Sequence, residues 1–265
     1  MEYHRNPAIQ LIAWVFFVPM SFTACSTTPR ASSPPPLQYE RNSPAGAAIR
    51  FMAAIKNDDA SQIVEAIHVR NSKELDAVEV YARFLLAEHR LANAAARRLN
   101  DLHGAVDGVP SNDAQLDENM RILAQAKVIQ TGDAAQLDFT LPAGQQTLYT
   151  RRSGGVWRVD LGKTCADLNH MTWNGQDDKR PRDNEAFHIN IWLHMAIADG
   201  LNQVAADIES GKIKTLQEAR DATQKAERDA GAREAYLLGQ SSAANFGLVN
   251  PSSPYDPPIH TPGNY

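Results

Sequence analysis

The chain has 265 residues and a formal net charge of −5, and 43% of its residues are hydrophobic. These values are typical of a globular protein with one or two domains and a sizeable core. The sequence has no block of clustered lysine and arginine, which a phosphate-binding surface requires, so nucleic acid is not expected as a partner.

The N-terminus is typical of an export signal. Arg5 precedes an apolar run over residues 8–20, which is the pattern of a signal peptide and is too short to span a bilayer. The run leads into Thr23-Ala24-Cys25-Ser26, which resembles the lipobox of bacterial lipoproteins, with Phe22 where that motif usually has leucine. The resemblance implies cleavage before Cys25, a diacylglycerol on its sulfur and an acyl chain such as palmitate on its amino group. The serine after the cysteine implies the outer membrane, facing the periplasm.

The alternative to a lipid anchor is ordinary signal cleavage, which would leave a soluble secreted protein. Residues 25–43 are rich in proline and serine and are expected to form an extended tether after the signal peptide of residues 1–24. Cys165, the other cysteine, is expected to be a buried structural residue, because no catalytic partner for it is apparent.

Capping patterns predict three helices after the tether. Their N-terminal signals are, in order, Ser43 with Pro44, then Asp58 or Asp59, and then the capping box of Asn71 with Glu74. The third helix is expected over residues 72–102, with a heptad seam of Leu75, Val78, Ala82, Leu85, His89, Ala92, Ala96 and Leu99. The seam fits a core helix, and a dimeric coiled coil is the alternative. His89 is expected to be a partly buried, hydrogen-bonded histidine, since no second metal ligand follows at i+4.

Residues 120–161 predict a four-stranded antiparallel meander. Turn residues separate its strands, and apolar residues alternate with polar ones within them. The alternating apolar positions are Ile122, Ala124, Ala126 and Val128, then Leu137, Phe139 and Leu141, then Trp157, Val159 and Leu161. One face of the sheet should therefore be apolar, and the preceding helices should cover it.

The C-terminal part predicts a helical hairpin. One helix should begin at Asp183 or Asn184 and end near Ser210, with Trp192 and Met195 broadening its apolar stripe. A second, half-exposed helix should begin at the capping box of Thr215 and Glu218, and Gly231 should stop it. His188 and His194 are six residues apart and cannot form a zinc pair on one helix face. The polar loop over residues 167–184 matches no calcium-loop spacing.

Two segments resemble the nuclear-transport-factor-2-like superfamily. Residues 51–60 resemble its opening helix and turn, and Gly154-Gly155-Val156-Trp157-Arg158-Val159 resembles its closing strand. The resemblance implies helices inside a curved sheet that forms a cone, which in some members holds a small molecule. Tyr81, His89, Phe139 and Trp157 are the residues expected to line such a pocket.

Some members of that superfamily are isomerases or dehydratases that place an Asp or His inside the cone. Here Asp138 and Asp160 alternate with apolar neighbours and should point away from it, so no catalytic residue is carried over. The expected fold class is α+β, with a cone-like domain over residues 44–163, a loop and hairpin over 164–232, and a disordered tail over 233–265.

The expected function is that of a membrane-anchored envelope lipoprotein, not an enzyme, that binds a protein partner or is structural. A binder of small apolar ligands and an isomerase or dehydratase are the alternatives. The sequence contains no catalytic, metal-binding or cofactor-binding signature, and it does not assign an oligomeric state.

Overall fold

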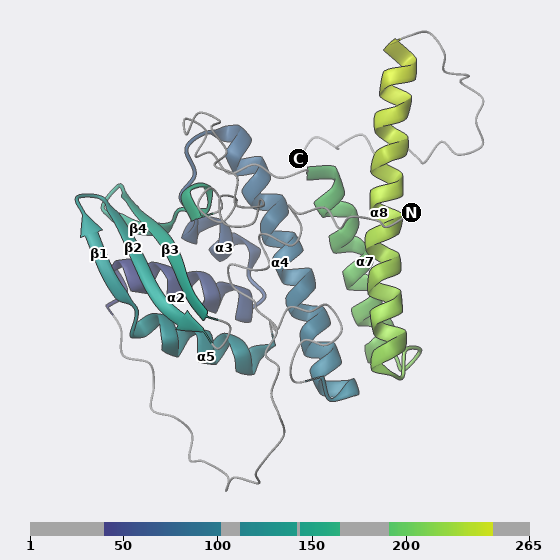
Figure 1. The fold of residues 1–265 in the computed structure, drawn as a ribbon, viewed down its shortest axis with the longest axis horizontal. Coiled ribbons are helices and arrows are strands. Elements are labelled where there is room, and N and C mark those ends of the chain that lie inside the picture. The colour runs from purple at the N-terminus through teal and green to yellow at the C-terminus, as the bar shows by residue number, and fades with distance from the viewer. Residues whose placement is uncertain (1–39, 102–111, 142–143, 165–190, 246–265) are drawn as a thin grey trace, which may run out of the picture.

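The structure, a computed structural model, describes residues 40–101, 112–141, 144–164 and 191–245. It confirms the α+β layout of helices, an antiparallel sheet and C-terminal helices (Figure 1). The helices are α2 (Pro44–Lys56), α3 (Ala60–Ala66), α4 (Ser72–Leu99), α5 (Asp113–Ala124), α7 (Ile191–Glu209) and α8 (Leu216–Asn245). The strands are β1 (Lys127–Thr131), β2 (Ala134–Leu141), β3 (Gly144–Ser153) and β4 (Val156–Val159).

The predicted capping residues begin the first three helices. The side chains of Ser43, Asp59 and Asn71 each accept a hydrogen bond from a backbone N–H in the first turn of α2, α3 and α4. The capping box at α4 is only half formed, because the Glu74 carboxylate accepts from the backbone N–H of Arg70 at 2.6 Å. The Glu74 carboxylate therefore binds the backbone N–H of Arg70, the residue before the cap, instead of the backbone N–H of Asn71.

Helix α5 corrects the prediction that a strand begins at Ile122. The side chains of Asn112 and Gln115 form a capping box, and Leu116, Met120 and Leu123 then lie buried on one side of a helix. This spacing of three and four residues, together with the cap, outweighs the short alternation at the end of the segment. The first strand therefore begins at Lys127.

The sheet has the strand order β1-β2-β3-β4, with antiparallel neighbours. Its inner face carries the predicted alternation in β2 and β4, where Leu137, Phe139 and Val159 are buried. Helices α2 and α5 lie on one side of the sheet (Figure 1). The prediction for Val128 is wrong, because this residue of β1 is 43% exposed.

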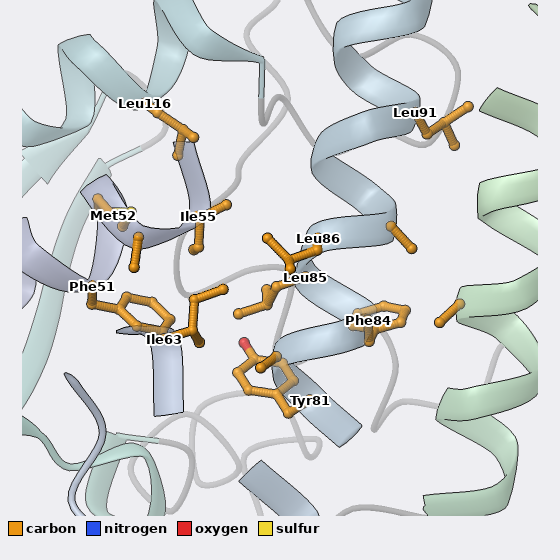
Figure 2. Packing of buried hydrophobic residues seen from close by; sticks show 14 of the residues in the cluster. Phe51, Met52, Ile55, Ile63, Tyr81, Phe84, Leu85, Leu86, Leu91 and Leu116 are labelled. Atoms are coloured by element: carbon orange, nitrogen blue, oxygen red, sulfur yellow. The ribbon is translucent and has the colours of Figure 1, made fainter. Parts of the chain in front are cut away.

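Helix α4 lies in the middle of the molecule and is covered on two sides. On one side its Tyr81 and Leu85 pack toward Phe51 and Ile63 of α2 and α3 (Figure 2). On the other side Phe84 points toward α7 (Figure 2). Leu75, at the start of the predicted seam, is 36% exposed, so the prediction that it belongs to the packed seam is wrong.

Helices α4 and α7 run side by side in the same direction (Figure 1). The Phe84 ring meets the His194 ring edge-on at 5.4 Å, Arg90 donates to the Asn202 side chain, and Arg97 pairs with Glu209. The residue numbers of these pairs rise together along both helices, which is the signature of parallel neighbours.

Helix α8 turns back along α7 and completes the predicted hairpin. Thr215 and Glu218 form the predicted capping box at its start. Gly231 does not stop the helix, which continues to Asn245 and extends past α7 (Figure 1). Trp192, which was expected to broaden the apolar stripe of α7, is instead 69% exposed. The predicted start of α7 at Asp183 or Asn184 lies outside the described residues.

Candidate functional site

The four residues predicted to line one pocket lie in three different surroundings. Tyr81 and Phe139 belong to the main hydrophobic core. Trp157 packs in a separate small cluster with Ala47 and Ala135. The His89 ring contacts polar side chains instead, those of Asn93 and Asp113. The structure therefore does not gather the four side chains around a single point.

His89 connects α4 to the beginning of α5. Its Nε2 lies 3.3 Å from Oδ1 of Asp113 and 3.1 Å from the side-chain nitrogen of Asn93. Asn93 also donates to Asp113 Oδ1 and accepts from the Asp113 backbone N–H, each at 3.1 Å. His89 is hydrogen-bonded as predicted, but at 3% exposed it is more fully buried than the partly buried histidine that the sequence predicted.

A group of charged side chains surrounds Asp160, just after β4. The Arg70 guanidinium donates to its two oxygens at 3.1 and 3.3 Å, and Arg151 Nε donates at 3.1 Å. The backbone N–H of Lys163 donates to it at 3.0 Å. We call Asp160, Arg70, Arg151 and the nearby His68 the Asp160 cluster. Burial of a carboxylate whose side chain is only 4% exposed is tolerated here because cations and an N–H surround it.

The Asp160 cluster joins three segments of the chain, and the one that holds Arg70 lies 90 positions from Asp160. Arg70 comes from the α3–α4 connection, Arg151 from β3, and Asp160 from the end of β4. Asp160 also caps the short helical turn over residues 161–164, in which Thr164 Oγ1 donates to the Asp160 carbonyl at 2.7 Å and accepts from the Tyr149 backbone N–H at 3.1 Å. The hydrogen bonds of the Asp160 carboxylate therefore connect parts of the protein's own fold.

His68 lies beside this carboxylate and responds to it electrostatically. Burial lowers the pKa of His68 from its ordinary value of 6.5, and the positive charges of Arg151 and Arg70 lower it further. The charges of Asp160 and Glu74 act in the opposite direction but do not reverse the shift. His68 is therefore neutral at pH 7, and its backbone N–H donates to the Val159 carbonyl at 2.7 Å.

Asp160 is buried, although the alternation placed it on the face of the sheet opposite the apolar one. Alternation correctly predicts that Asp160 does not share a side with Val159, yet Asp160 is 3% exposed. Its main partner, Arg70, is 90 positions away in the chain. No local pattern in the sequence indicates such a pair.

The two edges of the sheet differ in how their backbone groups are used. At β4, the N–H of Trp157 donates to the Asn42 side chain at 3.4 Å, and its carbonyl accepts from Arg50 at 2.7 Å. Ile67 forms a parallel bridge with Val159 on the same edge. At β1, all five residues are exposed. The β4 edge is thus covered by its own chain, and the β1 edge faces outward.

Within the described residues, no group of three or more His, Cys, Asp or Glu side chains is placed to hold a metal ion. Nor does any helix that the structure describes have the length and hydropathy of a membrane span. Cys25, Cys165, His188 and the polar loop over residues 167–184 lie outside the described residues.

No protein-family model matches this chain, and comparisons with curated proteins and with solved structures likewise found no match.

Proposed function

We propose that this protein is exported, lipidated at Cys25 and held at the outer membrane facing the periplasm, where it binds a protein partner without catalysing a reaction. The observation that carries the proposal is Thr23-Ala24-Cys25-Ser26 directly after an apolar run of signal-peptide length. Two acyl groups on the diacylglycerol and a third on the amino group would give durable anchoring, which one chain does not.

The Asp160 cluster supports a binding or structural role over catalysis. A catalytic carboxylate needs an oxygen that a substrate can approach, whereas both Asp160 oxygens accept hydrogen bonds from Arg70, Arg151 and Lys163. The exposed β1 strand supports partner binding, because it presents Val128 and Ile129 to solvent, 43% and 44% exposed.

The layout of helices α2 to α5 followed by an antiparallel meander supports the proposed resemblance to the nuclear-transport-factor-2-like superfamily. The pocket that the resemblance implies would have Tyr81, Phe139, Trp157 and His89 around one space. Because these side chains lie in three surroundings, we favour the partner-binding role over the ligand-binding and enzymatic alternatives.

The anchor can be tested by expressing the full chain in a Gram-negative host with an alkyne analogue of palmitate. We expect label in the protein, a membrane-bound fraction, and an intact mass that begins at Cys25 and includes the lipid groups. The matched Cys25→Ser variant should lose the label and retain its signal peptide. An unlabelled soluble product that begins near Ser26 would refute the anchor.

A further inference from the structure

The outer edge of β1 carries backbone groups that β2 does not use. The register pairs Thr131 with Ala134 across a two-residue loop. Residues that flank such a loop exchange hydrogen bonds, and bonded pairs alternate along an antiparallel ladder. The N–H and C=O groups of Val128 and Gln130 therefore point away from β2.

Natural proteins usually protect such an edge with a central charge, a proline, a bulge or a covering segment. β1 has the sequence Lys-Val-Ile-Gln-Thr, with one charge at its first residue and two exposed hydrophobic side chains in its middle. The opposite edge, at β4, is covered by Asn42, Arg50 and Ile67. Among the described residues, the covering is thus confined to one edge of the sheet.

We propose that two copies of this chain pair through β1, antiparallel and about a two-fold axis at Ile129, so that their two four-stranded sheets become one continuous sheet. In this register Ile129 lies opposite Ile129 of the second copy. The backbone N–H and C=O of Ile129 are hydrogen-bonded to β2, so the two Ile129 residues form a pair without mutual hydrogen bonds. In pairs of this kind the opposite side chains are closest. Val128 and Gln130 then exchange hydrogen bonds with Gln130 and Val128 of the second copy.

The side chains of β1 are self-complementary in this register. Lys127, the one charged residue of the strand, lies opposite Thr131 of the second copy, so no like charges face each other. Lys127 already has Asp138 opposite it within its own sheet. The two isoleucines bury each other on the outer face. A second copy of the chain is therefore complementary to this edge, and no partner of a different kind is required.

The pairing is expected to be weak in dilute solution, because a five-residue strand buries less area than a standard protein interface. Confinement of anchored copies to a membrane surface raises their local concentration and favours the pair. The inference rests on the proposed anchoring for this gain in concentration, whereas the geometry of the edge is independent of the anchor.

The test is cysteine cross-linking of the full chain in the envelope of the expressing cells, with Cys165→Ser as the background. Ile129→Cys should form a covalent dimer on mild oxidation, because opposite positions in such a strand pair bring Cβ atoms within disulfide reach. Val156→Cys on the covered edge is the matched control, since Val156 and Ile129 are 40% and 44% exposed. We expect the Ile129→Cys dimer to form about tenfold faster or more.

A second experiment tests the register. Copies that carry Lys127→Cys should cross-link to differently tagged copies that carry Thr131→Cys, since these two positions lie opposite each other. Each of these variants should cross-link poorly to itself, because identical positions are then about 13 Å apart along the strands. Thermal unfolding of each variant checks that it is folded.

The outcomes separate this inference from the proposed anchoring. Membrane-bound Ile129→Cys that cross-links no faster than Val156→Cys overturns the β1 pairing and leaves the anchor standing, as does a cross-link to a different protein. Soluble protein that still forms the Ile129→Cys dimer sinks the anchor and supports the pairing. A dimer in the Cys165→Ser parent itself would reveal a free Cys25 thiol and also refute the anchor.

Discussion

Replacing Gly200 with alanine is expected to loosen the hairpin of α7 and α8. Gly200 lies on α7 where α8 approaches closely, and a Cβ added there would meet the Cβ of Ala226 at 2.7 Å. Carbon atoms in favourable contact are about 3.5–4.0 Å apart, so the helices would have to separate by roughly 1 Å. The small size of Gly200 and Ala226 is what permits α7 and α8 to pack so closely.

Two opposing effects decide the magnitude. Overpacking of a tight contact costs about 1–3 kcal/mol, whereas alanine in place of glycine inside a helix stabilises by about 0.5–1 kcal/mol. We therefore expect Gly200→Ala to lower the free energy of unfolding by about 0–2.5 kcal/mol. For a chain of this size, each 1 kcal/mol corresponds to a fall in Tm of roughly 2–4 °C.

Gly231→Ala provides the matched control. Gly231 also lies within a helix, but a Cβ there would meet nothing within 4 Å. This variant should be stabilised by about 0.5–1 kcal/mol. Urea unfolding followed by circular dichroism measures both variants, and adding Ala226→Gly to Gly200→Ala should recover part of the loss as a coupling energy. If Gly200→Ala is as stable as Gly231→Ala, the close approach of α7 and α8 is refuted.

Three further predictions concern the region around β4. Asp160→Asn should lower the free energy of unfolding by about 2–4 kcal/mol, less than for a fully buried pair because the arginines that pair with Asp160 are partly exposed. In the same urea titration, the control Asp229→Asn on exposed α8 should change it by less than about 0.5 kcal/mol. Because burial lowers the pKa of His68, the unfolded chain binds a proton that the folded chain resists as the pH falls below about 6.5. Stability should therefore decrease from pH 7 toward pH 5, and His68→Gln should reduce that decrease; an unchanged pH profile would contradict the shift. Thr150→Val should be neutral or stabilising by up to about 1 kcal/mol, since the buried Thr150 hydroxyl has no hydrogen-bond partner among the described residues. Thr164→Val should instead cost about 1–3 kcal/mol, because it removes two hydrogen bonds, and thermal unfolding that ranks the two threonine variants in the reverse order would contradict this reading.

Features that depend on neighbouring residues could be predicted from the sequence. The caps at Ser43 and Asp59 and the box of Thr215 with Glu218 involve groups within three residues of each other, so local chemistry decides them. The inward alternation of Leu137 and Phe139 was predicted for a similar reason, because the period of a strand is a local property.

Local patterns failed where a competing signal or a distant partner decided the outcome. The capping box of Asn112 and Gln115 makes residues 113–124 helical, although Ile122 and Ala124 alternate as in a strand. Gly231 was expected to stop a helix, but it faces open space and α8 continues through it at the modest cost of an internal glycine. Asp160 is buried with the help of Arg70, a partner far away in the chain that local patterns do not indicate.

The exposed β1 edge lies between these cases. Its sequence contains Val128, Ile129 and Thr131, which are β-branched residues typical of a strand, but this composition does not say whether a strand lies at the edge or in the middle of a sheet. The strand order β1-β2-β3-β4 puts the first strand at one end, and there Val128 and Ile129 remain exposed. The candidate partner surface therefore required the topology.

The parallel contact between α4 and α7 has a consequence for how the chain reaches its native state. Phe84 meets His194 across a separation of more than one hundred residues. A polypeptide that is made or exported from its N-terminus presents this side of α4 to solvent until α7 follows, and contacts so distant in sequence form late. We expect truncation before α7 to leave an aggregation-prone fragment that depends on chaperones. Docking of the C-terminal hairpin is then the final step of folding.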